Sequence, residues 1–229
     1  MDLEIFQKNI DYKFNDIKLL KTALTHTSYA HEKKQESNEK LEFLGDAILE
    51  FIVSNYLYEN YKNLKEGEMT KVRATVVCEK SLYEVAKMHN FSDFLYLGKS
   101  EESSNGRNKP AILADSVEAL IAAIYLDSEL EQAKKFVINN LRQAIEIASK
   151  NVGIKDYKTV LQEKLQIHGS VNIKYELVEE RGPDHDKIFI AEVSCDGKKL
   201  AKGKGGTKKA AEMEAAKIAL ENLKKDVKI

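Results

Sequence analysis

Three acidic residues recur at helical spacing in the stretch NEKLEFLGDAIL, residues 38–49. At about 100° per residue, Glu39, Glu42 and Asp46 fall on one face of the predicted helix. The opposite face is predicted to pack on a core through Leu41, Leu44, Ile48, Phe51 and Ile52. Three carboxylates on one face repel one another unless a cation lies among them. This face is therefore either an acidic stripe exposed to solvent or a divalent-metal site.

A second pair of carboxylates lies in the strongly apolar stretch 111–127, which also predicts a helix. Asp115 and Glu118 are three residues apart, so they are neighbours on the helix surface. Their apolar surroundings predict partial burial, and buried carboxylates are rarely left unpaired because a charge loses its hydration there. Two interpretations remain, an ion pair with a basic side chain or a bound metal. The candidate bases are Lys71, Arg73 and Arg107.

The two helices together offer a set of oxygen ligands: Glu39, Glu42, Asp46, Asp115 and Glu118. Hard oxygen ligands without histidine or cysteine suit Mg²⁺ or Mn²⁺. Such carboxylate clusters hold the metal ions that activate water and stabilise the leaving oxygen when a phosphodiester is cleaved. If the two helices meet in the fold, the sequence predicts a divalent-metal site for phosphodiester chemistry.

Phe43 projects toward the carboxylate side of the first helix and not toward the core. An aromatic side chain there is covered by another element of the same chain or inserted into a partner. We expect the second arrangement, a homodimer packed through this helix. His26, in the polar run 25–28, offers a ligand or a base, but we expect it to hydrogen-bond within a helix junction.

Composition and charge divide the chain into two parts. At 229 residues it is long enough for two domains. Residues 1–152 carry 20 basic and 24 acidic side chains, whereas residues 153–229 carry 16 and 13, which indicates separate functions. Cys78 and Cys195 offer neither zinc spacing nor a disulfide framework, so a cytoplasmic protein is expected. The sequence begins without a signal-peptide pattern, and its longest apolar run is too short to cross a bilayer.

The first part is predicted to be all-α. The predicted helices are several short ones within residues 3–30, and longer ones over 38–61, 69–78, 81–89, 111–127 and 129–150. The predicted loops are the charged run 31–37, the break 63–68 with Gly67 as its turn residue, and the polar run 99–110. Ser37 or Asn38 is expected to cap the helix that follows, because their side-chain oxygens accept amide hydrogens of a first turn.

The second part is predicted to be α-β-β-β-α, after a short linker at residues 151–155. The predicted elements are a helix over 156–169, strands over 171–179, 188–195 and 198–204, and a helix over 205–224. Asp196-Gly197 predicts a tight hairpin turn between the last two strands. On the first of these helices one polar stripe is formed by Thr159, Gln162, Glu163 and Gln166.

Six lysines and no acid lie between residues 197 and 211: Lys198, Lys199, Lys202, Lys204, Lys208 and Lys209. The last two fall in the first turn of the final helix, where the helix dipole favours anions over cations. Their presence there suggests bound phosphates, although a solvated lysine cluster is the alternative. Because no pair of aromatic residues forms a stacking platform for single-stranded bases, a surface that contacts the phosphates of double-stranded RNA fits better.

Both parts resemble one family, ribonuclease III, over essentially the whole chain. NEKLEFLGDAIL resembles the family signature helix, ILADSVEALIAAIYLD (112–127) the second catalytic helix, and EGEMT (66–70) the acidic turn between them. DYKTVLQEKLQ, GPDH and GTKKAAEMEAA are similar to the three RNA-contacting regions of double-stranded-RNA-binding domains. The resemblance implies a multidomain protein, with an all-α endonuclease domain at 1–150, a linker at 151–155 and an α+β RNA-binding domain at 156–225.

The resemblance also implies the activity and its residues. It implies a Mg²⁺-dependent endoribonuclease, with Mn²⁺ as a substitute, that cleaves double-stranded RNA by divalent-metal-activated water. The resemblance further implies products with 5′-phosphate and 3′-hydroxyl ends, and ribosomal RNA precursors and structured messages as substrates. The implied metal ligands are Glu42, Asp46, Asp115 and Glu118, with Glu39 and Glu66 as accessory catalytic acids. The implied RNA contacts are Thr159, Gln162, Glu163, Gln166, His185, Lys208 and Lys209. Phe43 is the implied insertion into the partner subunit of a homodimer.

Two alternatives belong to other functional classes. One is a double-stranded-RNA-binding protein whose nuclease domain is inactive, and the intact set of four carboxylates argues against it. The other is a metal-dependent phosphohydrolase acting on nucleotides, which the basic second part disfavours. Binding to duplex RNA with a steep salt dependence separates an RNA-binding protein from a nucleotide hydrolase.

Overall fold

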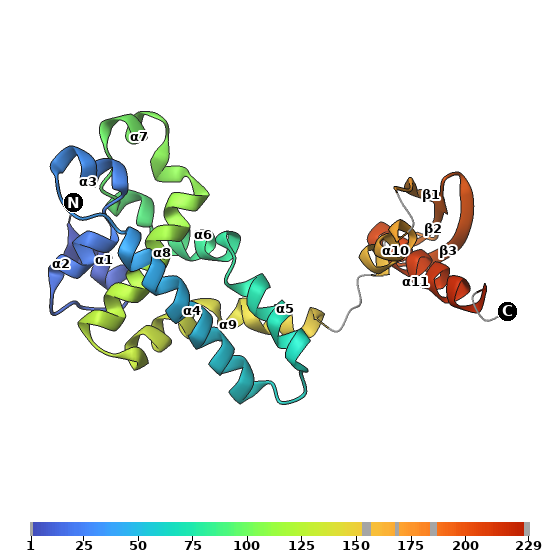
Figure 1. The fold of residues 1–229 in the computed structure, drawn as a ribbon, viewed down its shortest axis with the longest axis horizontal. Coiled ribbons are helices and arrows are strands. Elements are labelled where there is room, and N and C mark those ends of the chain that lie inside the picture. Colours follow the sequence, from blue (N-terminus) through green and yellow to red (C-terminus); the bar gives the residue numbers. More distant parts are fainter. Residues whose placement is uncertain (1, 153–156, 168–169, 184–186, 227–229) are drawn as a thin grey trace. The chain divides into compact units, whose positions relative to one another are not determined.

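The computed structural model describes residues 2–152, 157–167, 170–183 and 187–226 (Figure 1). The chain divides into two compact units, Met1–Gly153 and Ile154–Ile229. The first is helical and the second combines helices with a sheet, so the predicted order of an all-α part and an α+β part is confirmed. No helix in the described part of the chain is long and apolar enough to cross a membrane.

In the first unit two long helices, α4 and α8, lie side by side (Figure 1). Around α8 also pack α2, α6 and α9, which explains why its sequence is apolar on nearly every side. The elements of this unit are α1 (Leu3–Asn9), α2 (Ile17–Ala23), α3 (Thr27–Lys33), α4 (Glu39–Asn60), α5 (Glu66–Val76), α6 (Glu79–Met88), η1 (Phe91–Phe94), α7 (Lys99–Ser103), η2 (Gly106–Asn108), α8 (Pro110–Asp127) and α9 (Leu130–Asn151).

Two predicted loops are shorter than the sequence suggested. The loop predicted at residues 31–37 was wrong in its first half, because α3 continues until Lys34 ends it in the left-handed conformation, at a φ of 53°. Gly67 was wrongly predicted as a turn residue and lies in the first turn of α5. The Glu68 carboxylate accepts a hydrogen bond from the Lys65 amide at 2.8 Å, so a capping interaction starts this helix despite the glycine.

The polar run 99–110 was predicted as a loop, but it contains the short helix α7 and the 3₁₀ turn η2. Contacts with distant residues hold both. The Glu32 carboxylate accepts a hydrogen bond from the Lys99 amide at 2.7 Å, and the Arg107 guanidinium donates to the Ser92 carbonyl at 2.7 Å. These tertiary contacts have no signal in the local sequence.

The start of α4 also differs from the prediction. Asn38 is its N-cap residue, but its side chain makes no capping hydrogen bond. Instead the Asn38 amide donates to the Thr25 carbonyl at 2.8 Å, and the Ser37 hydroxyl donates to the Glu39 carboxylate at 2.9 Å. The helix start is therefore tied to the segment before α3.

The last residue of α8, Asp127, joins this helix to the N-terminal segment. Its carboxylate accepts hydrogen bonds from the Tyr12 hydroxyl at 2.8 Å, the Asn15 amide at 2.9 Å and the Asp16 amide at 2.7 Å. Burial raises the pKa of this carboxyl, but the hydrogen bonds outweigh burial and leave the pKa lowered. The ionised form of Asp127 thus organises the turn between α1 and α2.

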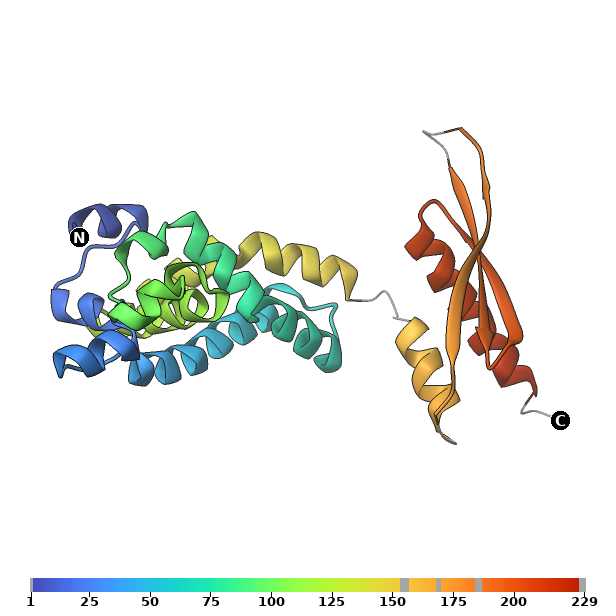
Figure 2. The same ribbon diagram turned by 90° about the horizontal axis from the view of Figure 1, so that it is seen from above.

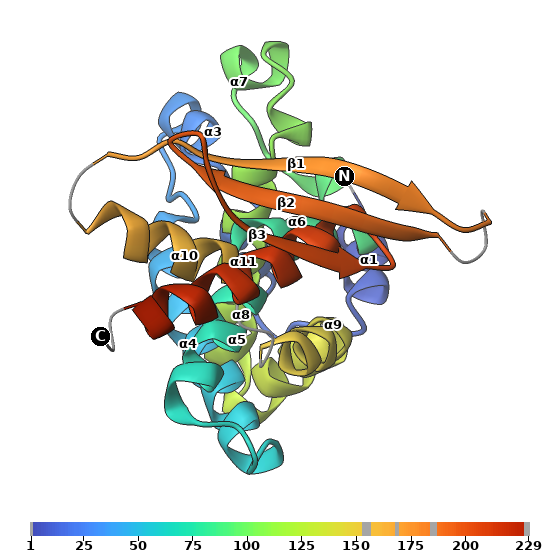
Figure 3. The ribbon, with the colours of Figure 1, turned by 90° about the vertical axis from the view of Figure 1, so that its right-hand side faces the viewer.

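The second unit has two helices packed on the same face of a three-stranded antiparallel sheet (Figures 2 and 3). Its elements are α10 (Tyr157–Gln166), β1 (Ile173–Arg181), β2 (Ile188–Cys195), β3 (Lys198–Gly205) and α11 (Lys208–Asp226). The predicted hairpin turn is confirmed, because Asp196 and Gly197 both have positive φ, at 49° and 82°. Of the predicted linker, residues 153–155 lie outside the described residues.

Candidate active site and RNA-binding surface

Three of the predicted carboxylates come together where α4 crosses α8. One carboxylate oxygen each from Glu42, Asp115 and Glu118 lies within 4.8 Å of the other two. All three side chains are half-buried. The interpretation of a purely solvated acidic stripe is therefore wrong for Glu42, which faces the second carboxylate pair. We call Glu42, Asp115 and Glu118 the carboxylate cluster.

Gly45 allows this close approach, and sequence reasoning assigned it no role. A Cβ atom at Gly45 would overlap the backbone carbonyl of Glu118, so only glycine lets the two helices meet at this point. Gly45 lies one turn after Glu42, and the contact therefore fixes the spacing of the cluster directly. The available signal was a single glycine inside a helix otherwise made of strong helix formers.

The cluster strongly perturbs the ionisation of Glu118. Burial first, and then the charges of Asp46, Asp115 and Glu42, raise the pKa of Glu118 to about 8. Burial followed by the charges of Asp115, Glu39 and Asp46 raises the pKa of Glu42. Carboxylates that repel one another in a partly buried site are typical of functional centres that take a cation.

Asp115 has a slightly different environment. Burial raises its pKa, the imidazole of His26 opposes this, and the charge of Glu79 adds to it. Glu79, in the first turn of α6, is an acidic neighbour of the cluster that the sequence did not single out. Its proximity depends on the packing of α6 against α8, for which the sequence held no signal.

The alternative of ion pairs within the chain is not what the structure shows. Among the described residues, no lysine, arginine or histidine forms an ion pair with Asp115 or Glu118. Arg73 donates to the Ser54 hydroxyl at 3.0 Å, and Arg107 pairs with Glu102 at 2.6 Å. The donor set, three hard oxygens with raised pKa values and no paired base, fits Mg²⁺ or Mn²⁺.

The other predicted acids lie outside this tight group. Asp46 is exposed, but it is near enough for its charge to raise the pKa values of Glu42 and Glu118. Glu39 is exposed as well and acts on Glu42 in the same way. Glu66 is the first residue of α5, beyond the far end of α4, and it is not among the acids whose oxygens lie within 4.8 Å of one another. In a single chain Glu66 therefore does not join the cluster.

Phe43 is not covered by its own chain, since 81% of its surface is exposed. Phe51 and Tyr58 follow it along α4 and are 56% and 68% exposed, so the prediction that Phe51 faces the core was wrong. At 100° per residue the three lie within about 80° of one another around the helix axis. The alternative of intramolecular burial is wrong, and α4 presents a stripe of aromatic side chains to its surroundings.

Four of the predicted RNA contacts line one groove of the second unit. Thr159, Gln162 and Gln166 of α10 and Lys209 of α11 border a groove of about 560 Å³. At its edge Lys158 pairs with Glu212 at 2.7 Å and lies 4.1 Å from the Tyr175 ring centre. This polar groove with lysines at its edge has the chemistry to contact phosphates and hydroxyls.

The remaining predicted contacts are placed differently. Glu163 is exposed on α10 and does not line this groove. Lys208 turns away from Lys209 and pairs with Glu180 of β1 at 3.4 Å. His185 lies outside the described residues. The structure thus separates two neighbouring lysines that the sequence treated as one pair.

Two of the six lysines between residues 197 and 211 form ion pairs with an acid on the neighbouring strand. Glu192, with 8% of its side chain exposed, pairs with Lys199 at 2.8 Å and with Lys202 at 3.6 Å. The hydrogen bond from Lys199 holds the pKa of Glu192 below its usual value. The charge of the lysine run is therefore partly neutralised. The sequence of the run did not indicate this, because Glu192 belongs to the preceding strand, β2.

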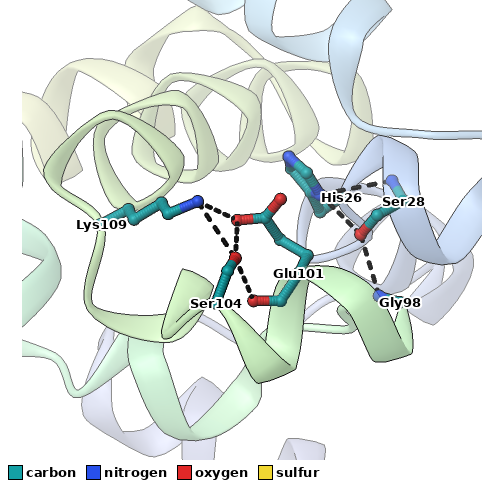
Figure 4. A network of polar contacts seen from close by, with 6 residues as sticks. All are labelled: His26, Ser28, Gly98, Glu101, Ser104 and Lys109. Carbon is teal, nitrogen blue, oxygen red and sulfur yellow. Dashed lines mark hydrogen bonds and ion pairs between the residues drawn. The ribbon is translucent and has the colours of Figure 1, made fainter.

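His26 has the structural role expected from the sequence. Its ring accepts a hydrogen bond from the Ser28 amide as the N-cap of α3. Its Nδ1 also lies 2.8 Å from the Ser28 hydroxyl, which accepts a hydrogen bond from the Gly98 amide at 2.9 Å (Figure 4). His26 thus ties the start of α3 to the segment that begins α7.

Comparison with known proteins gives matches over both units. Residues 16–145 match the family described as Ribonuclease-III-like, and residues 157–223 match the double-stranded RNA binding motif. Ribonuclease 3 of Clostridium tetani is 46% identical over 224 residues, which cover 97% of this chain and 95% of that protein. Ribonuclease 3 of Caldanaerobacter subterraneus is 46% identical over 223 residues, which cover 96% of this chain and 98% of that protein.

A solved structure matches the first unit. The nuclease domain of ribonuclease III from Campylobacter jejuni is 39% identical, with a TM-score of 0.59, and the match covers 62% of this chain and 98% of that one. The description of that structure refers to structural flexibility in a region involved in dimer formation. The sequence and structure comparisons therefore agree on the same family.

Proposed function

The chain belongs to the ribonuclease III family of endoribonucleases that act on double-stranded RNA, and we propose that it cleaves with a divalent cation held by the carboxylate cluster. The products would be duplexes with 5′-phosphate and 3′-hydroxyl ends. The observation that carries the proposal is the convergence of Glu42, Asp115 and Glu118, whose oxygens lie within 4.8 Å of one another. Mg²⁺ is the proposed cation, and Mn²⁺ would substitute.

Each residue of the site has a proposed role. A divalent cation bound there would supply positive charge to the scissile phosphate and make water a better nucleophile. Glu42, Asp115 and Glu118 would hold it, and Asp46 would be a fourth ligand because its charge already acts on this cluster. Since the pKa of Glu118 is about 8, cation binding near neutral pH would release a proton from this carboxyl.

We propose that the second unit holds the RNA duplex. Thr159, Gln162 and Gln166 would contact sugar hydroxyls, and Lys209 would contact phosphates, because these four line one groove. Glu163 and Lys208 are exposed on the same two helices and would extend the contact, as would His185. Recognition of 2′-hydroxyls and phosphates reads the shape of the duplex with little dependence on sequence. Ribosomal RNA precursors and structured messages are the proposed substrates.

We further propose a homodimer through α4. Its exposed stripe of Phe43, Phe51 and Tyr58 supports this, because a row of aromatic side chains is suited to a protein interface. An antiparallel pairing of the two α4 helices would also bring Glu66 of one subunit toward the cluster of the other. Phe43→Ser should lower the mass measured by light scattering from two chains to one. An unchanged mass would contradict this interface.

Cleavage of a labelled RNA duplex tests the proposed chemistry. The wild-type chain and Glu118→Gln are incubated with the duplex in Mg²⁺ and in EDTA. We expect discrete short duplexes only for the wild type in Mg²⁺. We expect cleavage by Glu118→Gln to fall by about 10³-fold or more, because a lost metal ligand removes several kcal/mol of transition-state stabilisation. Duplex binding by Glu118→Gln in Ca²⁺ should persist.

Two outcomes would point elsewhere. Tight duplex binding by the wild type without cleavage in Mg²⁺ or Mn²⁺ would indicate an RNA-binding protein with an inactive nuclease domain. Hydrolysis of free nucleotides without duplex cleavage would indicate a phosphohydrolase. The carboxylate cluster and the polar groove that Thr159, Gln162, Gln166 and Lys209 line together support the proposed cleavage of duplex RNA over both outcomes.

A further inference from the structure

A methionine thioether joins the two helices of the second unit, α10 and α11, which pack against each other (Figure 3). The Met213 sulfur of α11 accepts a hydrogen bond from the amide of Tyr157, the first residue of α10, at 3.2 Å. Beside this contact Lys158 pairs with Glu212 at 2.7 Å. The start of α10 is therefore held to α11 by a hydrogen bond to sulfur as well as by an ion pair.

Met213 also lines the polar groove of the second unit. It borders this groove of about 560 Å³ together with Thr159 and Gln162 of α10 and Lys209 of α11. Lys209 precedes Met213 by four residues, so the two side chains share one face of α11. The Met213 side chain is partly exposed. Its thioether is therefore accessible from the groove, and it lies between the helices whose side chains form the two sides of the groove.

Met213 differs from the other methionines that the structure describes. Met69 packs against the core of the first unit, and Met88 is 65% exposed at the end of α6. Neither of them lines the groove. Among the described methionines, a chemical change at sulfur therefore alters the groove directly only at Met213.

Hydrogen peroxide oxidises a methionine thioether to a sulfoxide. One oxygen atom passes from the peroxide to sulfur, the peroxide O–O bond breaks, a sulfur–oxygen bond forms, and water leaves. Sulfur loses two electrons and the peroxide gains them. The sulfoxide oxygen is a stronger hydrogen-bond acceptor than the thioether sulfur, and an amide bound to that oxygen lies farther from the sulfur than before. At Met213 the Tyr157 amide must then move away from the sulfur or lose its acceptor.

We infer that Met213 is an oxidation site through which hydrogen peroxide weakens the binding of duplex RNA. Oxidation converts an apolar side chain between α10 and α11 into a polar one and displaces the first turn of α10. Thr159 and Gln162 then lose their spacing from Lys209 across the groove. The inference rests on the proposed function, because it assumes that this groove holds RNA. The change is reversible, since methionine sulfoxide reductases restore the thioether.

Binding of a labelled RNA duplex to the full chain in Ca²⁺, before and after treatment with hydrogen peroxide, tests the inference. A thiol reductant added after the peroxide reverses disulfides and sulfenic acids at the two cysteines but leaves sulfoxides intact. Peptide mass spectrometry measures the oxygen gained at Met213, with the exposed Met88 as the reference. We expect oxidation of Met213 to weaken duplex binding about fivefold, as the loss of one hydrogen bond does. Treatment with sulfoxide reductases should restore the affinity.

Two variants separate Met213 from other sites of oxidation. Met213→Leu retains an apolar side chain of similar volume but has no sulfur, so its duplex affinity should not change with peroxide. Met88→Leu is the matched control and should lose affinity on oxidation as the wild type does.

Three outcomes would overturn the inference. They are equal losses of affinity in the wild type and Met213→Leu, unchanged duplex binding by a chain that carries the sulfoxide at Met213, and a Met213 that stays unoxidised when Met88 is oxidised. Failure of the untreated wild type to bind the duplex would instead overturn the proposed function.

Discussion

The carboxylate cluster and the polar groove lined by Thr159, Gln162, Gln166 and Lys209 are assembled in different ways. The cluster combines α4 and α8, which are far apart in the sequence, at a backbone contact that only glycine permits. Its acids are half-buried and repel one another. The groove uses exposed side chains of α10 and α11 around the small sheet, and Lys158 at its edge pairs with Glu212. The comparison teaches that chemistry on a phosphate needs exact spacing, whereas holding a duplex needs only charge and shape.

The largest expected effect breaks the spacing of the cluster. Gly45→Ala places a Cβ atom on the Glu118 carbonyl, so α4 and α8 must move apart. We expect the free energy of unfolding to fall by about 3 kcal/mol, together with most of the Mn²⁺ affinity. Urea unfolding and Mn²⁺ titration measure both quantities.

The control for this prediction is Gly67→Ala, because a Cβ atom at Gly67 meets nothing within 4 Å. That change lies in the first turn of α5 and should be neutral or slightly stabilising. If the two alanine variants unfold at the same urea concentration, the close contact at Gly45 is not what holds the two helices together.

The second expected effect concerns the ionisation of Glu118 in the carboxylate cluster. Below pH 8 the Glu118 carboxyl is mostly protonated in the metal-free fold, and a cation must displace that proton. We expect apparent Mn²⁺ affinity to rise close to tenfold per pH unit from pH 6 and to level off near pH 8. In metal-free protein, by contrast, the stability of the fold decreases as the pH rises. The raised pKa means that the protonated fold is favoured, so stability falls as pH rises from about 4.5 to about 8.

Thermal unfolding in EDTA at pH 5, 6.5 and 8 measures this loss of stability, and Glu118→Gln is the control because it cannot ionise. The variant should show a clearly smaller decrease over this range. A wild-type midpoint that rises with pH in the same range would contradict the raised pKa of Glu118.

The smallest effect concerns the groove. Lys209→Met should weaken duplex binding several-fold and lower the salt dependence by about one phosphate contact, equally for all sequences. Lys199→Met is the matched control, because Lys199 is bound to Glu192 and should contribute less. Filter binding between 50 and 200 mM salt gives both slopes. Equal losses of binding affinity for the two variants would mean that Lys209 contributes no more to RNA binding than Lys199 does.

Local patterns in the sequence predicted most elements well. The strand β2 has the predicted bounds 188–195, since it begins as an apolar run and ends at the hairpin turn Asp196-Gly197, both of which are local signals. The prediction of a loop over residues 99–110 was wrong because Glu32 and Ser92, which are distant in sequence, accept the hydrogen bonds that hold α7 and η2. Helix periodicity predicted which acids share one face of each helix. It did not show that Glu42 approaches the second pair more closely than Asp46 does, because that depends on the crossing of α4 and α8 at Gly45.

The hydrogen bonds of Asp127 have a consequence for the order of folding. They connect α8 to residues that precede it by 111 to 115 positions, so the turn between α1 and α2 gains its acceptor only after most of the first unit has been synthesised. On the ribosome, this turn therefore lacks its Asp127 acceptor while α3 to α7 emerge. Loop closure over this length is slow, and docking of the N-terminal segment is expected to be a late event in the folding of the nuclease domain.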